Sequence, residues 1–369
     1  MNGRDDACGS CLRRAFLVAH LAPRIAGLLD RPAPRVGGLL GLPEPELIAA
    51  AAGRRLEGAF QFLETFDAES ASENVERAGC GAVCRHSAAY PQRLHDLADQ
   101  PAVLFTMGRN EALDALRDEP VVAVVGTRQA SPYGTEVAYA LGRGLGAAGV
   151  PVVSGLALGI DGTAHRGCLE GGGLPVAVLA CGPDVAYPRR HRRLHQRVRE
   201  AGIVLSELPP GSNPFRWSFP ARNRIMAGLA GMTVVVEAAE PSGSLITADF
   251  ARDLGRAVAA VPGRVTSGVS RGTNGLLKDG AVPVTGTEDV LDELFGVGMR
   301  RVPDVPTARR EPDEPLRRVL DAAESSSSVD EIVRATGLGA GEARAALGRL
   351  ESEGFLIRRD LDGWERAAS

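Results

Sequence analysis

From about residue 118 onward, short runs of β-branched and other apolar residues alternate with glycine-bearing turns and helical stretches. The runs are apolar throughout rather than at every second position, which is typical of strands in a parallel sheet that is covered on both faces. They lie at 121–125, 150–153, 176–179, 203–205, 233–236 and 257–261. This alternation predicts an α/β fold with a Rossmann-like, doubly wound, mainly parallel sheet, in which ligands bind outside the carboxyl ends of the strands.

The rest of the 369-residue chain is long enough for further domains. Apolar residues at helical spacing predict a small helical N-terminal domain over residues 1–85. Residues 298–314 are rich in proline and charge, as linkers often are. Three helical stretches, the second opened by a Ser328-Val329-Asp330-Glu331 capping box, and an Asp362-Gly363 hairpin signal then predict a winged helix over 315–369. The predicted Rossmann-like domain therefore covers 86–297.

The charge balance is slightly acidic, with 42 Lys and Arg against 46 Asp and Glu and a net charge of −4. Affinity for nucleic acid must therefore come from a local basic patch, since most nucleic-acid-binding domains are basic overall. No apolar run is long enough to cross a bilayer, so we expect no membrane partner. The acidic first residues do not resemble a signal peptide, and we expect a cytoplasmic protein.

Small and hydroxyl-bearing residues follow the first two predicted strands and can bring backbone amides close to a phosphate at a helix start. They are Gly126, Thr127, Arg128 and Ser131 in the first loop, and Ser154, Gly155, Ala157 and Gly159 in the second. Neither loop has the G-x-G-x-x-G pattern, and no P-loop occurs, which weighs against a dinucleotide or nucleoside triphosphate. Asp161 and His165 come next, and each either stabilises the helix start or contacts a ligand.

The densest positive charge follows the third predicted strand, in the segment 187–193. Arg189 and Arg190 can contact phosphates, and Tyr187 can stack on a base. The alternative is a solvated helix face, because nearly all basic residues of this chain are arginines.

Two further stretches complete the candidate site. One is a polar trio before an apolar helix, and the other is a set of small and hydroxyl residues that can form an anion-binding nest. Their members are Arg222, Asn223 and Arg224, and Ser242, Gly243, Ser244 and Thr247. Arg222 and Arg224 can instead pair with buried carboxylates such as Glu207 or Glu237.

Six cysteines raise the question of metal binding or packing. A Cys8-Gly-Ser-Cys11 stretch has zinc-knuckle spacing, and Cys80, Cys84 and His86 can complete a tetrahedral site if the N-terminal region folds back. The zinc candidates are Cys8, Cys11, Cys84 and His86. Cys168 and Cys181 have apolar neighbours and are expected in the core. We expect no metal or cofactor at the strand-end site.

The motifs taken together resemble the DprA/Smf (DNA-processing A) family, in order and over about half of the chain. The matching stretches include Gly126-Thr127-Arg128, Ser154-Gly155-Leu156-Ala157, Gly159-Ile160-Asp161, Tyr187-Pro188, Phe219-Pro220, Arg222-Asn223-Arg224, Ser242-Gly243-Ser244 and Gly272-Thr273-Asn274. The resemblance implies a non-enzymatic homodimer that binds single-stranded DNA in a basic pocket. It also implies that the protein protects incoming DNA and loads the RecA recombinase during natural transformation. Arg128 matches the pocket arginine of the family, and Arg189 stands where a basic residue commonly follows Tyr-Pro.

Two alternatives stay open. Similar folds in phosphoribohydrolases cleave the glycosidic bond of a nucleotide, which requires a positioned carboxylate, and Glu237 and Asp249 are the nearest candidates here. The winged helix can bind duplex DNA or a protein partner. We favour the protein partner, because the third helix of that domain, its expected recognition helix, carries only two arginines, Arg344 and Arg349, and an acid, Glu342.

Overall fold

The computed structural model describes residues 7–28, 36–52, 56–303, 313–325, 328–352, 355–359 and 363–366. The chain divides into two compact units, Met1–Pro303 and Asp304–Ser369. The expected helical N-terminal region and the expected Rossmann-like domain therefore lie in one unit. The greater part of the expected linker, residues 304–312, lies outside the described residues.

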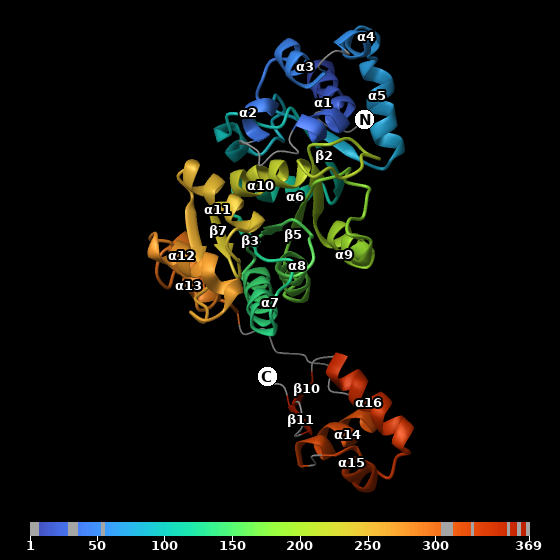
Figure 1. Ribbon diagram of the computed structural model, residues 1–369, viewed down its shortest axis with the longest axis vertical. Helices are drawn as coiled ribbons and strands as arrows, with labels where there is room; N and C mark the ends of the chain where they lie inside the picture. The colour runs from blue at the N-terminus through green and yellow to red at the C-terminus, as the bar shows by residue number, and fades with distance from the viewer. Residues whose placement is uncertain are drawn as a thin grey trace. The chain divides into compact units, whose positions relative to one another are not determined.

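The described residues of the first unit form a nine-stranded sheet of order β1-β2-β6-β5-β4-β3-β7-β8-β9 (Figure 1). The strands from β3 to β9 are parallel, and β2 and β1 are added antiparallel at one edge. Their bounds are β1 (Gly81–Cys84), β2 (Val103–Gly108), β3 (Val122–Val125), β4 (Val152–Ser154), β5 (Pro175–Leu179), β6 (Ile203–Ser206), β7 (Met232–Val235), β8 (Ala257–Ala260) and β9 (Val282–Pro283). The six apolar runs correspond to β3 through β8, so the predicted doubly wound, mainly parallel sheet is confirmed.

Both faces of this sheet are covered by helices, which explains why the strands are apolar throughout. Val122 and Val124 face one helical layer, whereas Ala123 and Val125 face the other. The first layer contains α7 (Pro132–Ala147), α8 (Ile160–Glu170), α9 (Arg192–Ala201) and α13 (Thr287–Phe295). The second contains α6 (Glu111–Asp118), α10 (Ser218–Leu229), α11 (Gly243–Asp253) and α12 (Arg271–Lys278).

The N-terminal helices pack against the same unit, beside β2 and α10 (Figure 1). They are α1 (Gly9–Leu28), α2 (Val36–Leu40), α3 (Glu44–Ala52), α4 (Leu56–Thr65) and α5 (Ala68–Arg77). Trp217 is buried among them and donates a hydrogen bond of 3.0 Å from Nε1 to the Ala22 carbonyl. On its other side α1 contacts the sheet, where the Phe16 and Phe105 rings meet edge to face at 5.9 Å. Because β1 pairs with β2, the strand just before the expected boundary at residue 85 belongs to the sheet.

The second unit has the predicted winged-helix composition. It contains α14 (Glu314–Ser325), α15 (Val329–Thr336), α16 (Ala340–Ser352) and an antiparallel hairpin of β10 (Leu356–Arg359) and β11 (Gly363–Arg366). The Ser328 hydroxyl accepts a hydrogen bond of 3.3 Å from the Glu331 amide and so caps α15, as its sequence signature predicts. Asp362 of the hairpin signal lies outside the described residues.

Across both units, no described helix combines the length and the apolar character needed to span a membrane.

Candidate functional site

A pocket of about 90 Å³ lies at the carboxyl ends of β4 and β5, beside the loop that follows β3. Its walls are contributed by segments that are far apart in the sequence, and they meet because parallel strands end at the same edge of the sheet. The lining residues are Arg128, Gly155, Ala157, Leu158, Leu179, Ala180, Cys181, Tyr187, Pro188, Phe219 and Arg222.

One side of the pocket combines a cation with two aromatic rings. The Arg128 guanidinium lies over the Phe219 ring, 4.9 Å from its centroid. The Phe219 ring in turn contacts the Tyr187 ring at 5.7 Å, tilted by 49°. Arg128 is exposed and Tyr187 is 40% exposed, so both can reach a ligand from solvent. Phosphate and base recognition commonly use this pairing of guanidinium and aromatic groups.

Phe219 was not among the predicted site residues. Its signal in the sequence was its place in Phe219-Pro220, directly before the polar trio that begins at Arg222. The sequence does not show that the first turn of α10 faces the loop after β3, and this contact is what brings Phe219 to Arg128.

The loop after β4 forms the floor of the pocket and has little room for side chains. A Cβ on Gly155 would lie 1.4 Å from Nη1 of Arg222, so a larger residue here requires the Arg222 guanidinium to move. Leu156 has a φ of 54°, which is uncommon for a residue with a side chain. Its carbonyl is 2.9 Å from Nδ1 of the buried His191. This contact ties the floor to the short 3₁₀ helix η2 (Arg189–His191), whose exposed Arg189 and Arg190 do not line the pocket but directly follow the lining residue Pro188.

The two loops after β3 and β4 also contact each other through their backbones. The Ile160 amide donates to the Thr127 carbonyl at 3.2 Å, and the Thr127 amide donates to the Glu237 carbonyl at 2.7 Å. A Cβ on Gly126 would meet Ile160, and a Cβ on Gly159 would meet the Thr127 carbonyl. Gly126 and Gly159 are therefore required by the packing of the two loops, and Thr127 joins them through its backbone, while Gly155 and Ala157 line the pocket itself.

Arg222 links the pocket to the start of α11. It is buried and donates to the Val178 carbonyl at 2.7 Å, to Oδ2 of Asp161 at 3.4 Å and to Oδ1 of Asn223 at 3.1 Å. Asn223 in turn donates a hydrogen bond of 3.1 Å from Nδ2 to the carbonyl of Gly243, the first residue of α11. Burial raises the pKa of Asp161 above its ordinary value, although the Arg222 guanidinium opposes this shift. Asp161 is therefore an internal partner of Arg222 and of the Gly155 amide at 3.2 Å.

The structure corrects the prediction that Arg224 contacts DNA. Its side chain is fully buried, with Nε 2.7 Å from Oδ2 of Asp99 and Nη2 2.8 Å from Oε1 of Glu207. The alternative pairing with Glu207 is the one that the structure has. A guanidinium held between two carboxylates inside the protein is not available to a phosphate.

Several hydroxyl side chains expected at the site serve the fold instead. Ser131 donates to Oε1 of Glu237 at 2.5 Å and caps α7, and Ser154 is buried and donates to the Val124 carbonyl at 2.7 Å. Thr247 is also buried. The Ser154 and Thr247 side chains are therefore enclosed by the protein, which leaves backbone groups of these segments as the part a ligand could approach.

The remaining members of the predicted nest lie at the start of α11. Ser242 caps this helix by accepting a hydrogen bond from the Ser244 amide at 3.4 Å, and Ser244 is largely buried. Gly243 is exposed. Of this nest, the exposed helix start at Gly243 is the part that a phosphate can still approach.

His165 is fully buried in α8, and in the described part of the chain neither ring nitrogen has a hydrogen-bond partner. The imidazole makes no hydrogen bond to Asp161 or to a backbone group, and His165 does not line the pocket. Burial lowers the pKa of His165 to about 3, so the ring is neutral in the folded protein.

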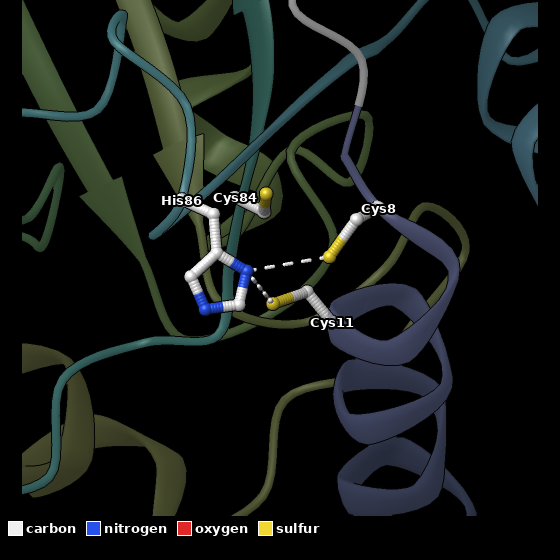
Figure 2. A group of neighbouring side chains, drawn as sticks. All are labelled: Cys8, Cys11, Cys84 and His86. Carbon is white, nitrogen blue, oxygen red and sulfur yellow. Dashed lines mark hydrogen bonds between the residues drawn. The ribbon is translucent and has the colours of Figure 1, made fainter.

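The cysteines separate into two groups. Ligand atoms of Cys8, Cys11, Cys84 and His86 all lie within 4.8 Å of one another (Figure 2). Cys80 is buried outside this group, with its thiol 3.7 Å from the Ala78 carbonyl. Cys168 and Cys181 are core residues as predicted, and burial raises the pKa of each thiol to about 12.

Comparison with known proteins gives a consistent result. A family model described as DNA recombination-mediator protein A matches residues 81–295, and one described as DprA winged helix domain matches residues 303–359. The DNA processing protein DprA of Streptococcus pneumoniae is 44% identical over 205 residues, which are 56% of this chain and 71% of that protein.

Two solved structures are also similar. The X-ray structure of DNA processing protein A from Streptococcus pneumoniae has a TM-score of 0.62 and 33% identity, covering 77% of this chain and 96% of that one. DNA processing protein A from Helicobacter pylori, described as having a unique single-stranded DNA binding mode, has a TM-score of 0.52 and 28% identity, covering 58% of this chain and 95% of that one.

Proposed function

Because this chain belongs to the DprA/Smf family of DNA-processing proteins, we propose that it binds single-stranded DNA at the pocket outside β4 and β5. The observation that carries the proposal is the contact of the Arg128 guanidinium with the Phe219 ring, which itself contacts Tyr187. Such a surface can contact the phosphate of a nucleotide with the guanidinium and stack an aromatic ring on the base of the same nucleotide.

In the proposed complex, Arg128, Arg189 and Arg190 contact phosphates at the rim, and backbone amides near Gly155 approach the DNA from the floor. Tyr187 and Phe219 stack on unpaired bases. A single strand can turn a base into a narrow pocket, whereas the bases of a duplex are already stacked and paired. Sequence specificity is low in this mode because every base has an aromatic face.

The wider role that we propose is non-enzymatic. The protein, as a cytoplasmic homodimer, protects incoming single strands and passes them to the RecA recombinase during natural transformation or recombination. Family membership supports this role. The test is whether the chain speeds the assembly of RecA on a strand that is already coated by a single-strand-binding protein, and whether Arg128→Ala abolishes that effect.

Hydrolysis of a nucleotide is less well supported by the geometry. Glu237, the carboxylate that such chemistry would need beside the nest, is buried and accepts hydrogen bonds from both the amide and the hydroxyl of Ser131. Asp249 is exposed on α11. No observation favours this second function.

The central experiment is fluorescence anisotropy with a labelled oligonucleotide, single- and double-stranded, over a salt series. Each phosphate contact on a single strand contributes about −0.7 to the slope of log Kobs against log salt. We expect the Arg128→Ala/Arg189→Ala variant to bind the single strand at least about tenfold more weakly and with a slope shallower by about 1.4.

Two variants complete the design. Tyr187→Leu should weaken binding by roughly 1–3 kcal/mol for the lost stacking, with the salt slope unchanged. Arg77→Ala removes one charge from an arginine that is 70% exposed on α5 and should bind as the wild type does. Equal binding by all four proteins, or a preference for duplex, would rule out this pocket as the site.

A further inference from the structure

We propose that Cys8, Cys11, Cys84 and His86 bind one zinc ion, which joins the first turn of α1 to the edge of the sheet. None of the four residues lines the pocket outside β4 and β5, and their ligand atoms are mutually within 4.8 Å. Figure 2 shows the thiols of Cys8, which precedes α1, and of Cys11, in the first turn of α1, directed toward the ring of His86.

Two of the interatomic distances match those of a tetrahedral zinc site. Nδ1 of His86 is 3.4 Å from Sγ of Cys8 and 3.6 Å from Sγ of Cys11. Zn–S bonds of about 2.3 Å and Zn–N bonds of about 2.0–2.1 Å at the tetrahedral angle place S and N about 3.6 Å apart and two sulfurs about 3.8 Å apart. Because the four ligand atoms lie within 4.8 Å of one another, the widest separation would have to close by at most about 1 Å to surround an ion.

Local structure explains why these four residues can meet. Cys8 and Cys11 stand three positions apart, and the Leu12 amide donates to the Cys8 carbonyl at 3.0 Å, so both thiols lie on one side of the first helical turn. Cys84 ends β1, and the Ser87 amide donates to its carbonyl at 2.8 Å in a turn that contains His86. Each pair is thus held by its own backbone before any ion binds.

The chemistry of the ligands selects zinc. Three thiolates and one imidazole in a tetrahedron are soft ligands of the kind that structural zinc sites use, and four protein ligands leave no open position for a substrate. Cys11 and Cys84 are buried in an apolar cluster that includes Leu12, Val75 and Phe105. Three thiolates with one Zn²⁺ carry a net charge of −1, and Arg85 lies between two of the ligands in the sequence.

The consequence is a cross-link between residues that are more than seventy positions apart. Zinc would hold the N-terminal helices on the edge strand β1, adding to the apolar contacts that already pack α1 on the sheet. The alternative uses of the same residues are thiol–imidazole hydrogen bonds without metal, or a Cys8–Cys11 disulfide under oxidation.

The test is metal analysis of the full chain purified under reducing conditions without chelator, together with titration of the metal-free protein with Co²⁺. We expect about one zinc per chain, and for Co²⁺ the visible absorption of a tetrahedral thiolate site. Loss of a residue that only hydrogen-bonds to a metal ligand typically lowers metal affinity 10- to 100-fold. His86→Ala removes a ligand itself, so it should lower the affinity by more than that. His86 is exposed, so this variant should still fold.

Three controls sharpen the result. His86→Cys restores a fourth ligand and should bind metal again. Cys80→Ser and Cys168→Ser each remove a thiol outside the group and should keep the full zinc content. The proposal is overturned if the wild type binds neither Zn²⁺ nor Co²⁺, or if zinc content is the same in His86→Ala and Cys84→Ser as in the wild type. Binding of single-stranded DNA is measured separately, so either proposal can fail without the other.

Discussion

Arg222 and Arg224 show how two identical side chains on one helix acquire different tasks. Arg222 lines the pocket and is held by a carbonyl, an amide oxygen and the single carboxylate of Asp161. Arg224 faces away from the pocket and is bound by the carboxylates of Asp99 and Glu207. A buried ion pair adds little net stability when intact, but removing one partner leaves uncompensated charge in the interior.

We therefore expect Arg224→Met to lower the free energy of unfolding by about 3–5 kcal/mol, because Glu207 loses its hydrogen bonds. Urea denaturation measures this loss. Arg77→Met is the matched control, since its side chain is exposed, and it should change stability by no more than about 0.5 kcal/mol. Similar midpoints for the two variants would show that the Arg224 pairs are not required for stability.

His165 makes stability depend on pH. Its pKa is about 3 in the folded protein, against about 6.5 in an unfolded chain. Between these values the unfolded chain binds the additional proton, so stability rises with pH. The contribution is complete above pH of about 6.5 and is lost as the pH falls toward about 3.

The variant His165→Gln should flatten the pH profile of unfolding in this window, by at most about 1.4 kcal/mol per pH unit. Urea denaturation from neutral pH down to mildly acidic pH measures both profiles. If the wild type and the variant show parallel profiles, His165 is not the source of the acid sensitivity.

At the scale of elements, the loop between β4 and α8 matters because it is both the floor of the pocket and a neighbour of Arg222. We expect Gly155→Ala to displace the Arg222 guanidinium from Val178 and Asp161, because the added Cβ would overlap Nη1. Stability should fall by about 1–3 kcal/mol, as when buried polar groups lose their partners, and single-strand affinity should fall with it.

The matched control is Gly58→Ala in α4, where an added Cβ meets nothing within 4 Å. Alanine in a helix interior should stabilise the protein by about 0.5–1 kcal/mol. Thermal unfolding and anisotropy on the two variants compare the positions directly. A Gly155→Ala protein as stable and as competent in DNA binding as the wild type would contradict the role that we give this loop.

At the scale of the whole molecule, the two units have separate cores. The first is built on the sheet and its two helical layers, and the second on Leu316, Val319, Ile332 and Leu347. Each unit therefore contains the apolar contacts needed to fold by itself.

A chain truncated after Pro303 should therefore keep its unfolding midpoint and bind single-stranded DNA within about threefold of the full chain, a difference of roughly 0.7 kcal/mol. Anisotropy and thermal unfolding of the two proteins test this. The isolated second unit should bind duplex DNA weakly, in keeping with a protein-docking role. Loss of single-strand binding on truncation, or tight duplex binding by residues 313–369, would assign DNA recognition to the winged helix.

The sequence by itself determined the parallel sheet and the winged helix, because both depend on local patterns. Continuous apolar runs identify β3 to β8, and the Ser328 cap identifies α15. It also placed Arg128, Gly155 and Tyr187 at one edge, since parallel strands bring their carboxyl ends together. The strands β1, β2 and β9 were not predicted. β1 and β9 are short strands at the two edges of the sheet, and β2, although it has six residues, lies before residue 118, where the alternation of strands and helices begins.

Only the tertiary structure decided which polar side chains are exposed to solvent and which are buried and paired with other groups of the protein. Arg222 and Arg224 are indistinguishable in the sequence, because their partners Asp161, Asp99 and Glu207 are distant along the chain. In the same way, the Cys8 and Cys11 spacing is local, but its meeting with His86 depends on how α1 packs against β1 and β2. Long-range contacts of this kind follow from the packing of whole elements, and no short stretch of sequence contains that information.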